Sequence, residues 1–123
     1  MEVDGGRDRK LLVASYELIG TAIFVYMIIV STGDPFAVPL ALFSMIVIFG
    51  GITGGHFNPA VTLGVYIHEG KWVENAPFAL IIMCAQLVGS MLAMLVTFCV
   101  LGFNREEDRK FVVGKHRVPI LAP

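Results

Sequence analysis

Charged residues are scarce in this chain, and most of them lie near its ends or in one internal polar segment. Asp, Glu, Lys and Arg make up only 15% of the 123 residues, and the formal net charge is −1. A charge so close to zero gives no electrostatic basis for binding nucleic acid. Hydrophobic residues account for 56% of the chain and the mean hydropathy is +0.77, which is typical of a membrane protein with several spans.

Cysteine is also rare. Cys84 and Cys99 are the two cysteines, and both fall on one predicted helix. Their separation corresponds to about 22 Å along a helix axis, whereas a disulfide requires Cα atoms within about 7 Å of each other. We therefore predict two unpaired thiols that serve as small core residues.

The residue combinations that enzymes use are missing from the sequence. It contains no nucleophile paired with a base, no phosphate-binding glycine loop and no cluster of metal ligands. His68-Glu69 lacks the second histidine of a zinc-binding helix. The sequence thus predicts neither an enzyme nor a cofactor or metal site. It also shows no cleavable signal or transit segment, which leaves the target membrane open.

Three apolar segments are candidates for membrane spans. The first, Leu11–Val30, has Glu17 as its single charge and can cross a hydrocarbon core of about 30 Å as a helix. We predict spans at about 11–32, 36–52 and 77–102, the last with Pro77 in its first turn, and a shorter helix at 59–68. The chain then divides into a polar tail (1–10), a membrane unit (11–103) and a polar or interfacial tail (104–123).

Glycine marks where we expect close packing. Gly89 lies between Ala85 and Ala93 at a spacing of four, which predicts a small-residue face for contact with another helix. Gly20 and Gly64 are interpreted in the same way, as positions where one helix crosses another.

The segment before the short helix is the most informative part of the sequence. Gly54 and Gly55 interrupt the apolar pattern, and Asn58 and Pro59 follow. Asparagine suits the cap of a helix and proline its first position. A helix of about ten residues is near 15 Å long, half a bilayer. Because non-helical backbone at membrane depth must be buried in protein or line a watery cavity, this segment predicts a permeation path.

Three motifs together resemble the first half of the aquaporin, or major intrinsic protein, family. They are Glu17-Leu18-Ile19-Gly20-Thr21 in the first span, Gly55-His56-Phe57-Asn58-Pro59-Ala60-Val61-Thr62-Leu63-Gly64 in the loop, and Ala85-Gln86-Leu87-Val88-Gly89 in the third span. The resemblance covers roughly residues 11–103. It implies an all-α membrane protein with three transmembrane helices plus one re-entrant half-helix, which is half of an aquaporin fold.

The resemblance also implies a set of pore-lining residues. Asn58 would offer a side-chain N–H to a passing water, although a helix cap buried against protein is the alternative interpretation. His56 would lie beside the pore, unless it is a packed neutral histidine or a gating group. The full set of pore-lining candidates is Asn58, Pro59, Ala60, His56, Gly54, Gly55 and Val38.

Two polar residues within the predicted spans are interpreted as structural. The resemblance implies that the Glu17 carboxylate accepts hydrogen bonds from backbone N–H groups of residues 50–57, which would otherwise be unpaired. Gln86 is expected to act in the same way from the third span. A proton relay is the alternative for Glu17, with His56 as its second group.

The sequence also departs from the family pattern. A full member has six spans and two Asn-Pro-Ala half-helices, whereas this sequence has one such motif and lacks the arginine that follows the second. Val38 stands at the position of a bulky filter residue and is too small to narrow a pore. The water selectivity of the family is therefore not expected of this chain.

Charge gives little information about orientation. The predicted topology places the N-terminus and residues 50–76 on one side of the membrane and the C-terminal tail on the other. Lys and Arg number four on the first side and five on the second, so the positive-inside rule barely discriminates. A pore built from inverted repeats could be formed by two copies of this chain that insert into the membrane in opposite orientations.

Two functions are compatible with these observations. We expect a structural or accessory subunit of a larger membrane complex, with the mitochondrial inner membrane as a candidate location. The alternative is a passive channel for water or a small neutral solute such as glycerol, formed by pairing with a second half-channel. In both cases the expected partners are the lipid bilayer and other membrane subunits or a second half, not nucleic acid, and the chain is not expected to act as a monomer.

Overall fold

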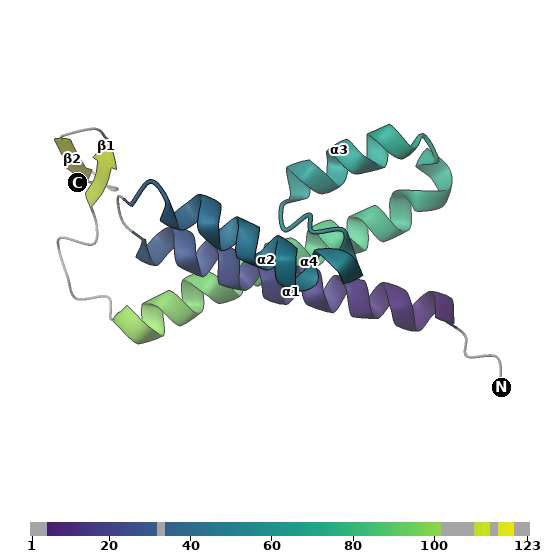
Figure 1. Ribbon diagram of the computed structural model, residues 1–123, viewed down its shortest axis with the longest axis horizontal. Coiled ribbons are helices and arrows are strands. Elements are labelled where there is room, and N and C mark those ends of the chain that lie inside the picture. The colour runs from purple at the N-terminus through teal and green to yellow at the C-terminus, as the bar shows by residue number, and fades with distance from the viewer. Residues whose placement is uncertain (1–4, 32–33, 102–109, 114–115, 120–123) are drawn as a thin grey trace.

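The computed structural model describes residues 5–31, 34–101, 110–113 and 116–119. Four helices are followed by an antiparallel two-stranded hairpin (Figure 1). The elements are α1 (Gly5–Val30), α2 (Ala37–Thr53), α3 (Pro59–Glu69), α4 (Trp72–Leu101), β1 (Lys110–Val113) and β2 (His116–Pro119). Helix α1 is central, because α2 packs along it and α4 crosses it, while α3 lies against α4.

Two of the described helices are long and apolar enough to cross a membrane. They are α1, over Gly6–Val30, and α4, over Trp72–Val100. Helix α2 is apolar but has only 17 residues. Length and composition thus support a predominantly helical membrane protein. The short hairpin is an addition to the predicted all-α fold.

Helices α1 and α4 cross at Gly89. A Cβ atom added to this glycine would overlap the Leu18 carbonyl oxygen and lie 3.2 Å from its carbon. Those atoms belong to the α1 backbone and cannot move aside as a side chain would. Ala93, one turn further along α4, is also buried. A small residue at position 89 is therefore required for the two backbones to approach.

The other two glycines singled out in the sequence behave differently from the prediction. At Gly20 the atoms nearest to an added Cβ belong to the Phe57 ring, in the loop before α3, and Cε1 would overlap it. Gly64 has open space around it, with no atom within 4 Å of the place that a methyl group would occupy. Gly20 is thus a position of close packing, as predicted, but its nearest neighbour is the loop, and no contact supports the predicted crossing at Gly64.

The start of α4 differs from the predicted span, which was expected to begin at about residue 77 with Pro77 in its first turn. The helix begins at Trp72, so that Pro77 lies inside it. The Tyr66 hydroxyl donates to the Trp72 carbonyl oxygen at 2.7 Å, and the Trp72 indole Nε1 donates to the Ile67 carbonyl oxygen at 3.4 Å. These bonds connect the end of α3 to the start of α4 and favour helical backbone earlier than the proline suggested.

The two ends of the helical unit also differ from the expected boundaries. Helix α1 begins at Gly5, within the predicted polar tail. Asp8 lies in its first turn, where a negative charge is favourable to the helix dipole. In the C-terminal tail, Phe111 pairs with Val118 and Val112 with Arg117 in the hairpin. Aromatic and β-branched residues favour such extended backbone. Residues 104–109 lie outside the described part.

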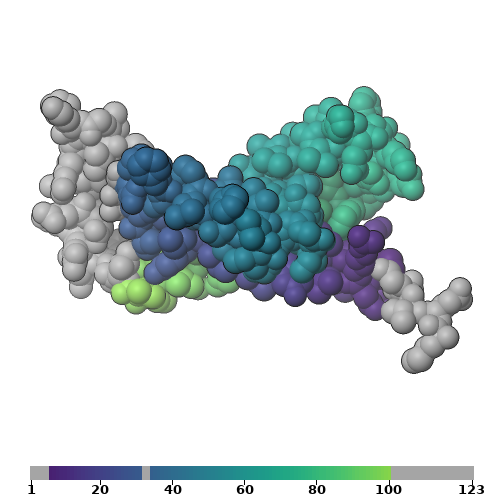
Figure 2. Space-filling model, viewed as in Figure 1, coloured from purple at the N-terminus to yellow at the C-terminus, as the bar shows by residue number. Residues whose placement is uncertain are grey.

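Much of the surface is apolar. Helix α4 buries one narrow stripe, which contains Ile82, Gln86, Gly89 and Ala93, and exposes its other faces. Cys84 and Cys99 are free, as predicted, but both are exposed and not in the core. Figure 2 shows that the visible surface dips between α2 and the raised end of α3. Exposed apolar faces of this extent fit a protein surrounded by lipid or by other membrane helices.

We expect Gly89→Ala to lower the free energy of unfolding by about 1–3 kcal/mol, because the added methyl group meets the α1 backbone. Gly64→Ala is the matched control, since the same methyl group enters open space and the change in stability should stay within about 1 kcal/mol. Denaturation by SDS in mixed micelles, followed by circular dichroism, measures both. Equal stability of the two variants would contradict the crossing.

Candidate functional site

The loop between α2 and α3 has an unusual backbone. Gly54 ends α2 with φ 91° and its N–H donates to the Gly50 carbonyl oxygen at 2.9 Å. Gly55 follows with φ 70°, and Phe57 has φ 45°. The two glycines adopt the left-handed region without steric cost, whereas a non-glycine residue there costs on the order of 1–3 kcal/mol. The conformation of Phe57 must therefore be held by its surroundings.

Glu17 of α1 supplies much of that support. Its side chain is 0% exposed, and its two carboxylate oxygens accept the backbone N–H groups of His56 at 3.1 Å and Phe57 at 2.7 Å. The Gln86 amide Nε2 of α4 donates to the same carboxylate at 2.8 Å. Three donors from two other segments thus converge on one buried carboxylate. This arrangement satisfies N–H groups that no helix pairs.

Phe57 is a site residue that sequence reasoning missed. Its side chain is 2% exposed and its ring fills the space opposite Gly20. It makes an edge contact with Phe49 at 6.3 Å between ring centroids, and Phe49 contacts Tyr16 at 5.4 Å. The ring therefore anchors the loop to α1 and α2. The signal available in the sequence was an aromatic residue between the histidine and the asparagine of the loop.

Thr62, in the first turn of α3, was also missed. It is 2% exposed, and its hydroxyl lies 2.9 Å from Gln86 Nε2, 3.1 Å from His56 Nδ1 and 3.2 Å from the Asn58 carbonyl oxygen. It joins the loop, α3 and α4 through one atom. Its position four residues after Asn58, on the same face of the helix, is the sequence signal that could have identified it.

Asn58 caps α3. Its backbone is extended (φ −155°), its Oδ1 accepts the Ala60 N–H at 2.8 Å, and Pro59 occupies the start of the helix. The other end of α3 is closed by Gly70 in the left-handed conformation, with φ 69°. Asn58 and Ala60 are exposed, and no hydrogen bond joins the Asn58 Nδ2 to another residue in the described part of the chain.

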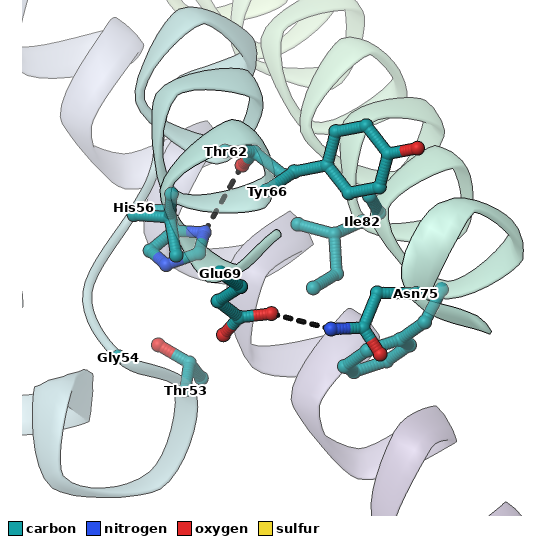
Figure 3. Close-up of a pocket in the computed structure, with 11 residues that line it drawn as sticks. Thr53, Gly54, His56, Thr62, Tyr66, Glu69, Asn75 and Ile82 are labelled. Carbon is teal, nitrogen blue, oxygen red and sulfur yellow. Dashed lines mark hydrogen bonds between the residues drawn. The ribbon is translucent and has the colours of Figure 1, made fainter. Parts of the chain in front are cut away.

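A cavity of about 490 Å³ opens between the loop, α3 and the start of α4 (Figure 3). His56, Thr62, Tyr66 and Glu69 line it from one side, and Asn75 and Ile82 from α4 line the other. The Asn75 Nδ2 donates to Glu69 Oε2 at 2.5 Å, which connects the end of α3 to α4 across the cavity. The cavity thus has polar groups at its rim and apolar groups from α4 at its wall.

The structure brings some of the predicted pore residues together and separates one. Gly54 and His56 line the cavity. Gly55, in the same loop, and Pro59, the first residue of α3, are half-buried. Val38 lies at the opposite end of α2, about 22 Å along the helix axis from Thr53. The pore-lining roles of all these residues remain predictions. Within the described residues, no group of three or more His, Cys, Asp or Glu side chains could hold a metal ion.

Comparison with known proteins identifies the class of protein to which this arrangement belongs. A sequence profile described as "Major intrinsic protein" matches residues 35–118, which is more than half of the chain. The match includes the loop, the capped helix α3 and α4 with Gln86. The chain belongs to the major intrinsic protein family, whose members are channels in membranes.

Several characterised relatives are similar over part of their length. The chain is 35% identical to glycerol uptake facilitator protein-like 6 of Lactiplantibacillus plantarum over 63% of this chain and 38% of that protein. It is 36% identical to aquaporin-8 of Mus musculus over 66% of this chain and 35% of that protein, and 37% identical to aquaporin Z of Photorhabdus laumondii over 55% and 28%. The chain therefore spans less than half the length of these relatives. No solved structure gives a significant match.

We expect Glu17→Gln to lower the free energy of unfolding by about 1–3 kcal/mol. The amide keeps the shape of the side chain but has one acceptor oxygen, so at least one of the loop N–H groups loses its partner. Ser15→Ala on the same helix is the control, because this hydroxyl is exposed and bonds only to its own helix. Thermal unfolding in detergent compares them; a Glu17→Gln variant as stable as the parent would refute the role of the carboxylate.

Proposed function

We propose that this chain forms one half of a passive membrane pore for water or a small neutral solute such as glycerol. Family membership supports a channel, and the names of the relatives refer to aquaporins and to glycerol uptake. The observation that carries the proposal is the exposed Asn58 amide at the start of α3, on a loop held by the buried Glu17 carboxylate.

In this proposal α1, α2 and α4 span the membrane and α3 enters it only halfway. Helix α2 has 17 residues, or about 25 Å, and needs a few residues at its ends to reach across the hydrocarbon core. Helix α3 has 11 residues, or about 16 Å, so a start near the middle of the bilayer brings its end to the surface. The exposed Trp72, which follows α3, suits a position at the membrane interface.

The chemistry of the loop favours neutral solutes. The N-terminus of α3 carries about half a positive charge from the helix dipole, which repels cations. The Asn58 Nδ2 offers an N–H donor to a hydroxyl oxygen, and the backbone of Gly54, Gly55 and His56 offers carbonyl acceptors. A water or a polyol can exchange hydrogen bonds with these groups in sequence. Flow then follows the solute gradient without ion coupling.

A second half-channel is the partner that this proposal requires. The exposure of Asn58 and Ala60 leaves one side of the pore without a wall, and further membrane helices must supply it. The accessory-subunit function expected from the sequence is not what the comparisons support; they favour the channel.

The first experiment is the mass and composition of the particle extracted gently from membranes that contain the chain. A small particle, made of this chain and one further half-channel, is the expected result. A large particle with many unrelated subunits would instead favour the accessory function and argue against the pore.

We expect Asn58→Asp to lower solute permeability about fivefold, because it removes an N–H donor worth about 1 kcal/mol. The aspartate still caps α3, so that folding is preserved. Asn58→Ser is the matched variant: it also retains the cap and lacks the amide donor, but carries no charge. Stopped-flow shrinkage of vesicles containing the intact particle measures water and glycerol fluxes. Fluxes equal to those of the parent in both variants would exclude Asn58 from the pore.

A further inference from the structure

We propose that Thr62 is a positioning residue that fixes the tautomer of His56. Its hydroxyl donates to Nδ1 of the imidazole, so that the ring carries its hydrogen on Nε2 and presents that N–H to the cavity. The consequence for transport rests on the proposed function, whereas the tautomer itself does not. The proposal rests on which of its neighbours receives the hydrogen of the Thr62 hydroxyl.

Glu17 fixes the first hydrogen bond of this network. Both Glu17 oxygens already act as acceptors for backbone N–H groups, so the Gln86 atom that lies 2.8 Å from Oε2 is assigned as the amide nitrogen. This contact fixes the orientation of the Gln86 side chain. The amide has a second N–H, and Nε2 lies 2.9 Å from the Thr62 hydroxyl oxygen. Thr62 therefore accepts a hydrogen bond from Gln86.

The Thr62 hydroxyl then has one hydrogen to donate and three acceptors within reach. His56 Nδ1 is nearest at 3.1 Å, and the Asn58 carbonyl oxygen and Gln86 Oε1 follow at 3.2 Å and 3.3 Å. The Asn58 carbonyl already accepts the Thr62 backbone N–H at 3.0 Å, and Gln86 already donates to this hydroxyl. The imidazole nitrogen has no other partner in the described residues. In the reverse arrangement Nδ1–H would donate to the hydroxyl, which would then give its own hydrogen to the Asn58 carbonyl, an acceptor that already has a backbone N–H. We assign the hydroxyl hydrogen to Nδ1, the nearest of its three acceptors.

The other ring nitrogen faces open space. No hydrogen bond joins His56 Nε2 to another described residue, and His56 lines the cavity (Figure 3). A Cβ at Gly54 would lie 3.4 Å from Nε2, so the missing side chain at this position leaves the nitrogen accessible. The neutral ring thus offers an N–H donor to the cavity. Its complement is a hydroxyl oxygen of water or a polyol.

The test is nitrogen NMR of the full chain in lipid nanodiscs, labelled with ¹⁵N-histidine. Spectra are recorded at a pH of about 8.5, where a model imidazole is neutral. His68→Gln and His116→Gln variants assign the signals. We expect His56 Nδ1 to resonate as an unprotonated nitrogen and Nε2 as a protonated one. The opposite pattern in the parent protein would overturn the proposal.

Substitutions at position 62 then test the cause. Thr62→Val keeps the shape of the side chain but removes the hydroxyl, and we expect the single His56 tautomer to become a mixture. Thr62→Ser restores the hydroxyl and should restore the single tautomer. Thr97→Val is the control, because that hydroxyl bonds only to the Ala93 carbonyl oxygen of its own helix. If Thr62→Val fails to fold, the parent spectrum still decides the tautomer, and a mixed tautomer there counts against the proposal.

Flux measurements separate this inference from the proposed function. The absence of flux in the parent particle would reject the channel and leave the tautomer assignment intact. Where the parent conducts, we expect glycerol permeability of Thr62→Val to fall at least about threefold relative to Thr62→Ser. A fall in permeability with an unchanged tautomer would show that Thr62 acts only on the fold, and would overturn the positioning role.

Discussion

The Glu17 carboxylate is the constraint on which the rest of the structure depends. It accepts hydrogen bonds from the backbone of His56 and Phe57 and from the side chain of Gln86, and in this way connects α1, the loop and α4. Three residues of this loop have positive φ, and the N–H groups of His56 and Phe57 are paired by the carboxylate and not by a helix. Without the carboxylate these N–H groups would be buried and unpaired, which is costly in a membrane.

Around this carboxylate, the packing depends on two glycines whose missing side chains allow close contacts. Gly20 makes room for the Phe57 ring and Gly89 for the α1 backbone, so α1 receives the loop on one side and α4 on another. The chain thus positions the start of α3 by two kinds of contact, a polar one that satisfies hydrogen bonds and a steric one that excludes alternatives. Asn58 is exposed as the result of both.

The helices and the cap of α3 could be predicted because local chemistry defines them. Apolar length indicates α1, and an Asn-Pro pair indicates the start of α3. The contacts of Phe57 and Thr62 could not, because they depend on where α1 and α4 place Gly20 and Gln86, far away in sequence. The start of α4 was missed for a related reason: Pro77 suggested that the helix begins near residue 77, whereas the contact between Tyr66 and Trp72 lies five residues earlier. The hairpin after α4 forms by cross-strand pairing, which cannot be predicted from the length of an apolar segment.

The sequence separations within the Glu17 network have a consequence for how the protein is made. The partners of this carboxylate lie 39, 40 and 69 residues later in the chain. All three partners are therefore synthesised after α1. A lone carboxylate at the centre of a span costs on the order of 2.5–3.5 kcal/mol. The Glu17 carboxylate gains its full set of partners only when the loop and α4 are both in place, so the final packing of α1 depends on segments that are synthesised after it.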